Sequence, residues 1–576
     1  MAPSSSTSQF GPIENAKKSR KPPSCDPCRA RRVLCHPQPG GAACPRCAEK
    51  EIICTTTPTA RGRPRKNPPR QGSSIGRPHQ TIPSLVLHPQ PNFGTSVDCP
   101  ELSPEFVAHC LEGLSPNPLF HHPLISAAAI MSEIRAVSFQ LHLLPPQTRV
   151  LALCSIAGGS LLAFHKSVLG DGPRPKSFDD NDFFSSSPDI LGCGVRRAAA
   201  CRALRAEALK AAWEVGIILS PSNENAASCY LLDLLEQTDQ ISSAGRPWAT
   251  AYLAHARALA PNWRPPSGLP WGEFFWTAFL MHEGLISARG RTPAIITAQD
   301  QLFFCGPERS LETLLESLES SANNASVSLL WTSIKSYMFN VTTLARQLLD
   351  QITGDVPRSN PLSEVAVLNF LNSLSKLHST LSLLLDRIDG FTIVPGIDPS
   401  PDASIEVLLI TAAYGGCHGF GGLALPFYRE LQYREACGGA PQSDRTQGRL
   451  RALKMQAHDM AVVAGRELAR GIRYLPKIHY APVHWITIRA WAEFVAEDAD
   501  MVTADGAPLD AEAARDLVTF ADELKMLGYS LDAASTPETL ALIERLEGHA
   551  NRALVSMFLP IDYEAKPSTG TYHPQR

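Results

Sequence analysis

The chain of 576 residues lacks the patterns of a secreted protein, a β-sheet protein or an enzyme. Its first residues, MAPSSSTSQFGPIENAKKSRK, contain no apolar stretch like that of a secretory signal, which counts against a disulfide-linked secreted domain. Glycine- and asparagine-led hairpin turns are scarce after about residue 100, which favours helices there. The glycine-rich GGCHGFGG is not followed by G-K-[ST], so it is no phosphate loop. No nucleophile, base and orienting group are assembled in this region, and we expect no enzyme.

Cysteine is present in quantity, but it is unevenly placed. Six of the 15 cysteines lie near the start in the spacing C-x2-C-x6-C-x8-C-x2-C-x6-C, and they are Cys25, Cys28, Cys35, Cys44, Cys47 and Cys54. The run consists of two copies of C-x2-C-x6-C joined by an eight-residue loop. The other nine have no paired spacing and are predicted to be reduced core thiols of an intracellular protein.

The spacing of the six cysteines predicts a metal site. Tetrahedral zinc takes four ligands, at about 2.3 Å for thiolate sulfur. Two zinc ions need eight ligand positions, so six cysteines suffice only if two thiolates bridge both metals. RING- and LIM-type modules usually recruit histidine and longer spacings, whereas His36 alone lies inside this run. Metal storage would require denser cysteine. We therefore favour a binuclear cluster over these alternatives and over a disulfide framework.

This spacing resembles that of the fungal Zn2Cys6 binuclear zinc-cluster domain. The resemblance implies a small module of two short helices over residues 25–54 that holds two zinc ions and binds double-stranded DNA. It also implies that Cys25 and Cys44 bridge the metals. Cys28 and Cys35 would complete the ligand set of one zinc ion, and Cys47 and Cys54 would complete that of the other. The implied function is a sequence-specific regulator of RNA polymerase II genes in the nucleus.

The basic residues between the cysteines are of the kind that binds DNA. Arg29, Arg31 and Arg32 follow Cys28 on the expected first helix, and arginine pairs bidentately with guanine in the major groove. The resemblance implies that Arg32 reads a CGG-like triplet, although relatives usually carry lysine at that position. We expect Arg31 to read bases as well, and the phosphate contacts to come from Arg29, Lys17, Lys18, Arg20, Lys21 and Arg46. The alternative role of these arginines is to neutralise a cluster of net charge −2.

Charge separates the head of the chain from its body. Residues 1–72 hold fourteen basic residues (Lys and Arg) and four acidic residues (Asp and Glu), which give a net charge of +10. The remainder of the chain holds 39 basic and 52 acidic residues, which give a net charge of −13. The sum is the formal −3 of the whole chain. A basic head attracts phosphates through counterion release, and this polarity fits a DNA-binding module tethered to a body with another role.

A basic, proline-rich stretch follows the cysteines. Residues 55–95 carry eight prolines and no apolar heptads, which predicts an extended linker without a dimerising coiled coil. Within it, R-G-R-P-R-K is similar to an AT-hook, whose arginines enter a narrow minor groove, and its basic residues are Arg61, Arg63, Arg65 and Lys66. A nuclear-import signal is the alternative. We expect disordered segments at 1–24 and 563–576, and a linker over 55–100.

The remaining region, 101–562, is predicted to be a large all-α body. One apolar stripe at helical spacing is Leu204, Ala208, Ala211, Val215 and Ile218. A second helix begins at Thr536-Pro537 and carries the stripe Leu540, Ile543, Leu546, Ala550, Ala553 and Met557. Similar patterns occupy about 226–240, 248–260, 310–350, 362–388, 403–435, 448–472, 483–497 and 509–526.

Part of the body resembles the regulatory (middle homology) domain of fungal transcription factors. The segment Pro270–Ile295 holds an aromatic F-W-x-x-F helix that leads into G-R-x-P-x-I, and residues 248–260 resemble the helix before it. The family's usual aspartate is replaced around His282-Glu283. The resemblance implies a body that dimerises, binds transcriptional co-regulators or senses a metabolite. Monomeric DNA binding and a homodimer both stay open.

Two further patterns have competing interpretations. The stretch 407–428 lacks charged residues and is long enough to span a bilayer, but its glycines and Pro426 favour a buried helix pair, and we expect no membrane partner. Cys417 and His418 are adjacent, and neighbours on a helix rarely face each other, so a thiol–base pair is not expected. For the whole protein, the alternatives to a regulator are an architectural binder of A·T-rich DNA and an enzyme delivered to chromatin.

Overall fold

The computed structural model divides into two compact units, Met1–Gln90 and Pro91–Arg576. Each is described by itself. The residues described are 24–31, 33–38, 42–56, 99–114, 122–177, 180–186, 189–238, 245–262, 271–320, 327–392, 403–437, 444–475, 482–504 and 507–558.

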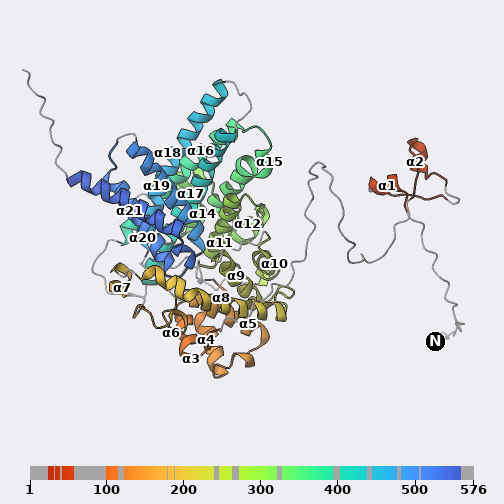
Figure 1. Ribbon diagram of the computed structural model, residues 1–576. Coiled ribbons are helices and arrows are strands. Elements are labelled where there is room, and N and C mark those ends of the chain that lie inside the picture. Colours follow the sequence, from red (N-terminus) through yellow and green to blue (C-terminus); the bar gives the residue numbers. More distant parts are fainter. Residues whose placement is uncertain are drawn as a thin grey trace, which may run out of the picture. The chain divides into compact units, whose positions relative to one another are not determined.

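The first unit contains two five-residue helices, α1 (Asp26–Ala30) and α2 (Pro45–Glu49) (Figure 1). Each begins directly after a cysteine whose backbone is extended, and each has a proline in its first turn. Proline favours this position because its fixed φ angle suits a helix start and its missing N–H would have no helical partner there.

The second unit is a stack of helices, and all regular secondary structure in the described residues is helical, which confirms the all-α prediction. Short 3-10 turns include η6 (Pro482–His484) and η7 (Asp532–Ser535), and a π-turn, η5 (Leu349–Thr353), follows α14. The α-helices are α3 (Pro104–Glu112), α4 (Ala127–Ala136), α5 (Pro146–Ser160), α6 (Lys166–Leu169), α7 (Asn181–Ser186), α8 (Ile190–Val215), α9 (Asn223–Thr238), α10 (Pro247–Leu259), α11 (Trp271–Gly290), α12 (Ala298–Cys305), α13 (Leu311–Ser320), α14 (Val327–Leu348), α15 (Asp355–Arg358), α16 (Glu364–Thr392), α17 (Ala403–Cys437), α18 (Asp444–Tyr474), α19 (Trp485–Ala504), α20 (Ala511–Gly528) and α21 (Pro537–Phe558).

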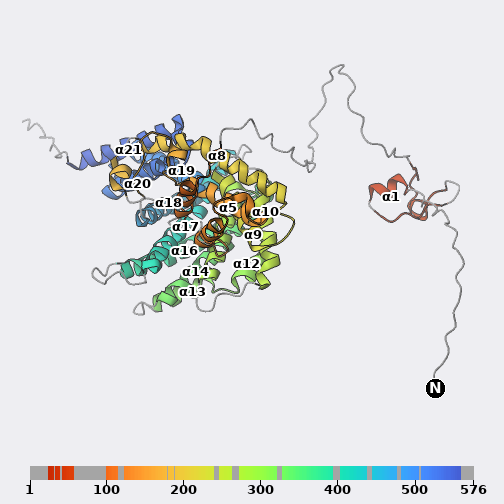
Figure 2. The ribbon, with the colours of Figure 1, turned by 90° about the horizontal axis from the view of Figure 1, so that it is seen from below.

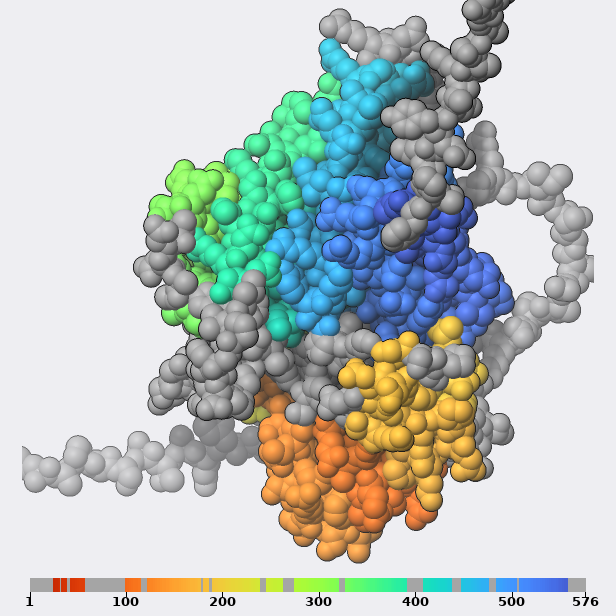
Figure 3. Space-filling model, turned by 90° about the vertical axis from the view of Figure 1, so that its left-hand side faces the viewer, coloured from red at the N-terminus to blue at the C-terminus, as the bar shows by residue number. Residues whose placement is uncertain are grey.

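Two large hydrophobic cores hold the body together. The first is built mainly from α3–α5 and α8–α12, and the second from α13, α14 and α16–α21. Helix α11 belongs to both, because Trp276, Phe279 and Leu280 enter the first core while Met281 and Leu285 enter the second. In Figures 1 and 3 the first helices, in orange, lie at one end of the body, and α16 with part of α18 lies at the opposite end.

Helix α17 lies at the centre of the second core, between α14, α16 and α18 (Figure 2). The uncharged stretch 407–428 was expected to form a helix pair, but it lies within this one continuous helix. By length and composition α17 could span a membrane, yet 78% of its apolar window is buried inside the body. A Cβ at Gly422 would lie 2.9 Å from a methyl group of Leu285, so this glycine lets the Leu285 side chain of α11 pack closely against α17.

The first predicted stripe is correct up to the point where its helix ends. Leu204, Ala208 and Ala211 are buried, but Ile218 is exposed and Ile217 is buried instead. The reason is that α8 ends at Val215 and Gly216 takes the left-handed φ of 67°, which changes the direction of the chain.

The second stripe is correct in its middle and wrong at both ends. Ile543, Leu546, Ala550 and Ala553 are buried, whereas Leu540 and Met557 are exposed. At the start of α21 the buried side chains are those of Thr539 and Leu542, so Leu540 faces away from the core. The last turn of α21 is exposed, so Met557 has no core to pack against. The pattern over 310–350 forms two helices, α13 and α14, rather than one.

Candidate metal centre

The two cysteine half-repeats fold alike. Cys25 precedes α1 with φ −64° and ψ 155°, and Cys44 precedes α2 with φ −62° and ψ 150°. In the first half the N–H of Val33 donates to the carbonyl of Cys28 at 3.1 Å, and in the second the N–H of Ile52 donates to that of Cys47 at 2.9 Å. A 19-residue sequence offset therefore relates two structurally equivalent halves.

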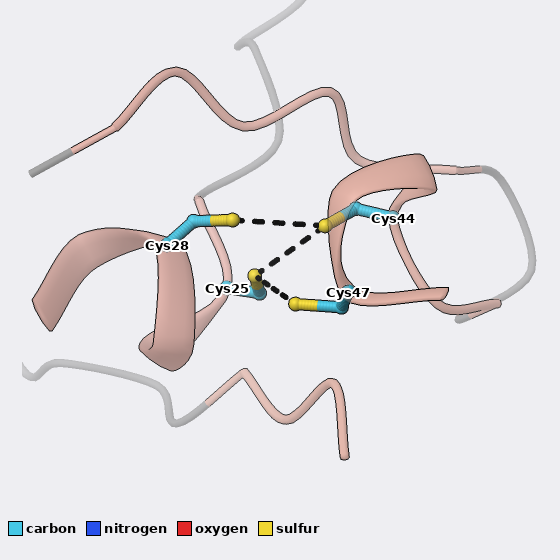
Figure 4. Close-up of side chains that lie close together, drawn as sticks. All are labelled: Cys25, Cys28, Cys44 and Cys47. Atoms are coloured by element: carbon cyan, nitrogen blue, oxygen red, sulfur yellow. Dashed lines mark hydrogen bonds between the residues drawn. The ribbon is translucent and has the colours of Figure 1, made fainter. Parts of the chain in front are cut away.

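Four thiols from these halves point toward one another between the two helices (Figure 4). Cys25, Cys28, Cys44 and Cys47 are all buried, and their sulfur atoms lie within 4.8 Å of one another. The Sγ–Sγ distances are 3.8 Å for Cys25–Cys44, 3.7 Å for Cys25–Cys47 and 3.7 Å for Cys28–Cys44. The edge of a tetrahedron with zinc–sulfur bonds of about 2.3 Å is about 3.8 Å, so these thiols are placed to hold a metal ion.

The contacts run in a line, from Cys28 to Cys44 to Cys25 to Cys47 (Figure 4). Cys25 and Cys44 occupy the middle, and each contacts a thiol of the opposite half-repeat. The remaining cysteines join at these central residues, since the thiol of Cys35 lies 3.7 Å from that of Cys25 and the N–H of Cys44 lies 3.5 Å from the Cys54 sulfur. Both Cys35 and Cys54 are half-buried.

The two central cysteines also favour the thiolate form. The backbone N–H of Cys28 is the main cause that lowers the pKa of Cys25 to about 6, and the N–H of Cys47 has the same effect on the pKa of Cys44. These donors lie three residues after each cysteine, in the first turn of α1 and of α2. Burial, followed by the neighbouring thiols, raises the pKa of Cys28 to about 12. Burial first, and then the charges of neighbouring thiolates, therefore oppose ionisation of all the thiols unless a cation compensates them.

The basic residues predicted to contact DNA are only partly described. Arg29, Arg31 and Arg46 are exposed, and Arg29 forms an ion pair with Asp26 one turn earlier. The remaining predicted contacts lie outside the described residues: Arg32, Lys17, Lys18, Arg20, Lys21, Arg61, Arg63, Arg65 and Lys66.

Two exposed apolar side chains lie beside cysteines of the cluster. Leu34 is 74% exposed and Ile53 is 83% exposed, and each directly precedes the last cysteine of its half-repeat. The equivalence of these two positions is visible in the sequence, because they are separated by the same 19 residues as the equivalent cysteines of the two half-repeats.

Cys417 and His418 do not form a reactive pair. Burial raises the pKa of the Cys417 thiol, which packs against Gly471, while the His418 ring stacks on that of His484 at 4.1 Å. The two side chains leave α17 in different directions, as expected for adjacent helical residues.

Comparison with known proteins gave no match: no protein-family model, no curated protein and no solved structure is similar to this chain.

Proposed function

We propose that the protein is a zinc-cluster DNA-binding transcription regulator whose helical body carries the regulatory role. The observation that carries the proposal is the pair of equivalent half-repeats with converging thiols, at Sγ–Sγ distances of 3.7–3.8 Å. The resemblance of the six-cysteine spacing to the fungal Zn2Cys6 domain supplies the function. A basic head on an acidic body supports it, because a positive module is attracted to phosphates.

In this proposal two zinc ions share the six thiolates. Cys25, Cys28, Cys35 and Cys44 would surround one ion, and Cys25, Cys44, Cys47 and Cys54 the other. Every short contact between the thiols falls within one of these two sets. Four thiolates leave no open position on either metal, so the zinc would stabilise the module and would not act as a Lewis acid.

DNA recognition would begin from the end of α1. Arg31 follows this helix directly and its side chain is exposed, so it is free to reach a base edge in the major groove. Arg29 and Arg46 are exposed as well and would contact phosphates. The helical unit Pro91–Arg576 would bind co-regulators, dimerise or respond to an effector in the nucleus.

The test combines zinc counting with site selection on the full chain. Native mass spectrometry should find two zinc ions per chain, and selection from random duplex DNA should enrich a CGG-like triplet. Absence of zinc would contradict the proposal. Two zinc ions with enrichment of A·T tracts alone would favour the architectural alternative, in which the arginines of the R-G-R-P-R-K segment provide the binding.

The base-reading role of Arg32 has a separate test. We predict that Arg32→Ala weakens binding to the selected site by about 1–3 kcal/mol and leaves binding to scrambled DNA nearly unchanged, because a bidentate base contact is lost. Lys50→Ala is the control, since Lys50 is exposed and lies after α2. Affinities should be measured at one salt concentration. An equal loss on both DNAs would show that Arg32 contacts phosphate only.

A further inference from the structure

A layer of polar side chains crosses the body where its two hydrophobic cores meet. Helix α11 spans both cores and contributes His282, Glu283 and Arg289 at their junction. Helix α17 adds His418, and η6 adds His484. Polar groups in such a position are stable only when their charges and hydrogen bonds are satisfied.

One half of this layer is satisfied. Arg246 donates to Asp233 at 2.5 Å and to Glu283 at 2.6 Å, so one guanidinium links two nearly buried carboxylates. Gln237 donates to Asp233 at 2.7 Å and lies 3.3 Å from Nε2 of His282. This half has its donors and acceptors paired and acts as a structural clamp between α9, α10 and α11.

The other half has a cation without an acid. Arg289 is partly buried and donates to the hydroxyl of Thr487, and it makes no ion pair within the described part of the chain. Burial, and then the positive charge of Arg246, lower the pKa of Arg289 to about 10. The charge of Arg289 also acts on His282 and His418, and within the described part of the chain no acidic group is among the causes that shift the pKa of Arg289.

His418 presents an unused polar atom at the same place. The side chain is 5% exposed, and its Nε2 has no hydrogen-bond partner among the residues that the structure describes. Its ring is held in position by stacking on His484, whose Nδ1 lies 2.8 Å from the hydroxyl of Tyr414. A buried polar atom left without a partner is energetically costly, so this arrangement is unfavourable unless something binds there.

We propose that Arg289 and His418, with Thr487 beside them, bind a small oxyanion at the junction of the two cores. The ligand is either the carboxylate of a small organic acid or an inorganic oxyanion such as phosphate or sulfate. The guanidinium supplies the compensating charge and a forked donor, which suits both groups. Burial holds the pKa of His418 near 3, so the ring is neutral and offers one N–H to the anion. The site belongs to the body alone and stands independently of DNA binding.

The experiment titrates the full-length protein with acetate, citrate, phosphate and sulfate, against chloride at matched ionic strength. Calorimetry and thermal unfolding should show saturable binding and a rise in Tm with at least one oxyanion. A response to carboxylates alone identifies an organic acid, and a response to phosphate or sulfate alone identifies an inorganic or phosphate-bearing ligand. No oxyanion effect beyond that of chloride would overturn the proposal.

Three variants separate binding from structure. Arg289→Gln should lower the affinity at least tenfold and, without anion, should leave Tm unchanged or raise it, because an uncompensated charge is removed. Arg449→Gln is the control, since Arg449 is exposed and pairs with Glu364 on the surface, and it should bind as the wild type does. If Arg289→Gln does not fold, His418→Gln carries the test with the same expected loss of affinity. Unchanged affinity in a folded Arg289 or His418 variant would overturn the proposal.

Discussion

At the scale of single residues, Cys25 and Cys44 differ from the other cysteines of the cluster. Both precede a short helix, both accept from a backbone N–H in its first turn, and each contacts two thiols of the opposite half-repeat. In the proposed cluster these two central thiolates would bridge both metals, and each outer thiolate would bind one.

We predict that Cys44→Ser disturbs both metals, because one bridging ligand is lost from each. Native mass spectrometry should find fewer than one zinc per chain. Cys54→Ser should retain about one zinc, since it removes a ligand from one ion only. Cys437→Ser is the control, because Cys437 is an exposed cysteine outside the cluster. Loss of a single zinc from Cys44→Ser with the module folded would argue against bridging.

His122 illustrates a residue that the sequence did not mark. It is buried, its Nδ1 accepts from the N–H of Leu124 at 2.9 Å, and its Nε2 lies 2.7 Å from the hydroxyl of Tyr252. Burial lowers its pKa from 6.5 to about 3. The folded protein therefore keeps this ring neutral, while the unfolded chain takes up a proton as the pH falls below about 6.5.

This histidine should make the protein sensitive to acid. Its contribution to stability is complete above about pH 6.5 and is lost progressively toward about pH 3, because only the unfolded state is protonated in that range. Asparagine keeps an acceptor near Nδ1 but does not titrate. Between about pH 7 and about pH 5, the free energy of unfolding should fall by about 2 kcal/mol less in His122→Asn than in the wild type. Urea unfolding at both pH values measures this difference, and equal falls would refute it.

At the scale of elements, glycine in helices decides how closely they approach. Gly194 in α8 lies against the turn after α20, and a Cβ there would be 2.3 Å from the carbonyl oxygen of Gly528. Gly192 lies two residues earlier in the same helix and has nothing within 4 Å of the equivalent position. The sequence shows two similar glycines, and only the packing distinguishes them.

These two glycines form a matched pair of variants. Gly192→Ala should raise the free energy of unfolding by about 0.5–1 kcal/mol, because alanine favours the helix and meets no neighbour. Gly194→Ala should lower it by about 1–3 kcal/mol, because the new methyl group collides with backbone that cannot easily move. Denaturant titration of both variants measures the difference. Similar effects of the two substitutions would contradict the packing described here.

At the scale of the whole molecule, the cysteine module and the helical body are separate compact units. The described residues of the module form two five-residue helices and a small cluster of buried cysteines, so we expect its stability to come largely from a bound metal. The body has two large hydrophobic cores, and we expect its packing not to depend on a metal.

Removal of metal should therefore affect the folding of the cysteine module but not that of the helical body. We predict that EDTA abolishes specific DNA binding, while the far-ultraviolet circular dichroism and the main thermal transition stay nearly unchanged. Added zinc should restore binding, because metal binding and folding are coupled in such modules. A large fall in the Tm of the main transition on chelation would show instead that the body depends on the metal.

Several features of this protein could be read directly from the sequence. Local periodicity is sufficient to place helices such as α18 and α20, since each buries one face at a regular spacing. The repeated cysteine spacing identified four thiols that meet in space. Ligand spacing is a short-range property, which is why sequence reveals it.

Only the tertiary structure decided the features that depend on which surfaces meet. The burial of Ile217 in place of Ile218, and the single helix over 407–428, follow from where a chain turns and what packs against it. The same is true of Arg289 and His418, which are 129 residues apart in the sequence but close enough in the fold for the charge of Arg289 to lower the pKa of His418. Ligand spacing and helical periodicity are local properties, so the sequence alone determines them. A side chain loses contact with solvent and with a compensating charge only when distant helices pack around it, so the tertiary structure decides this.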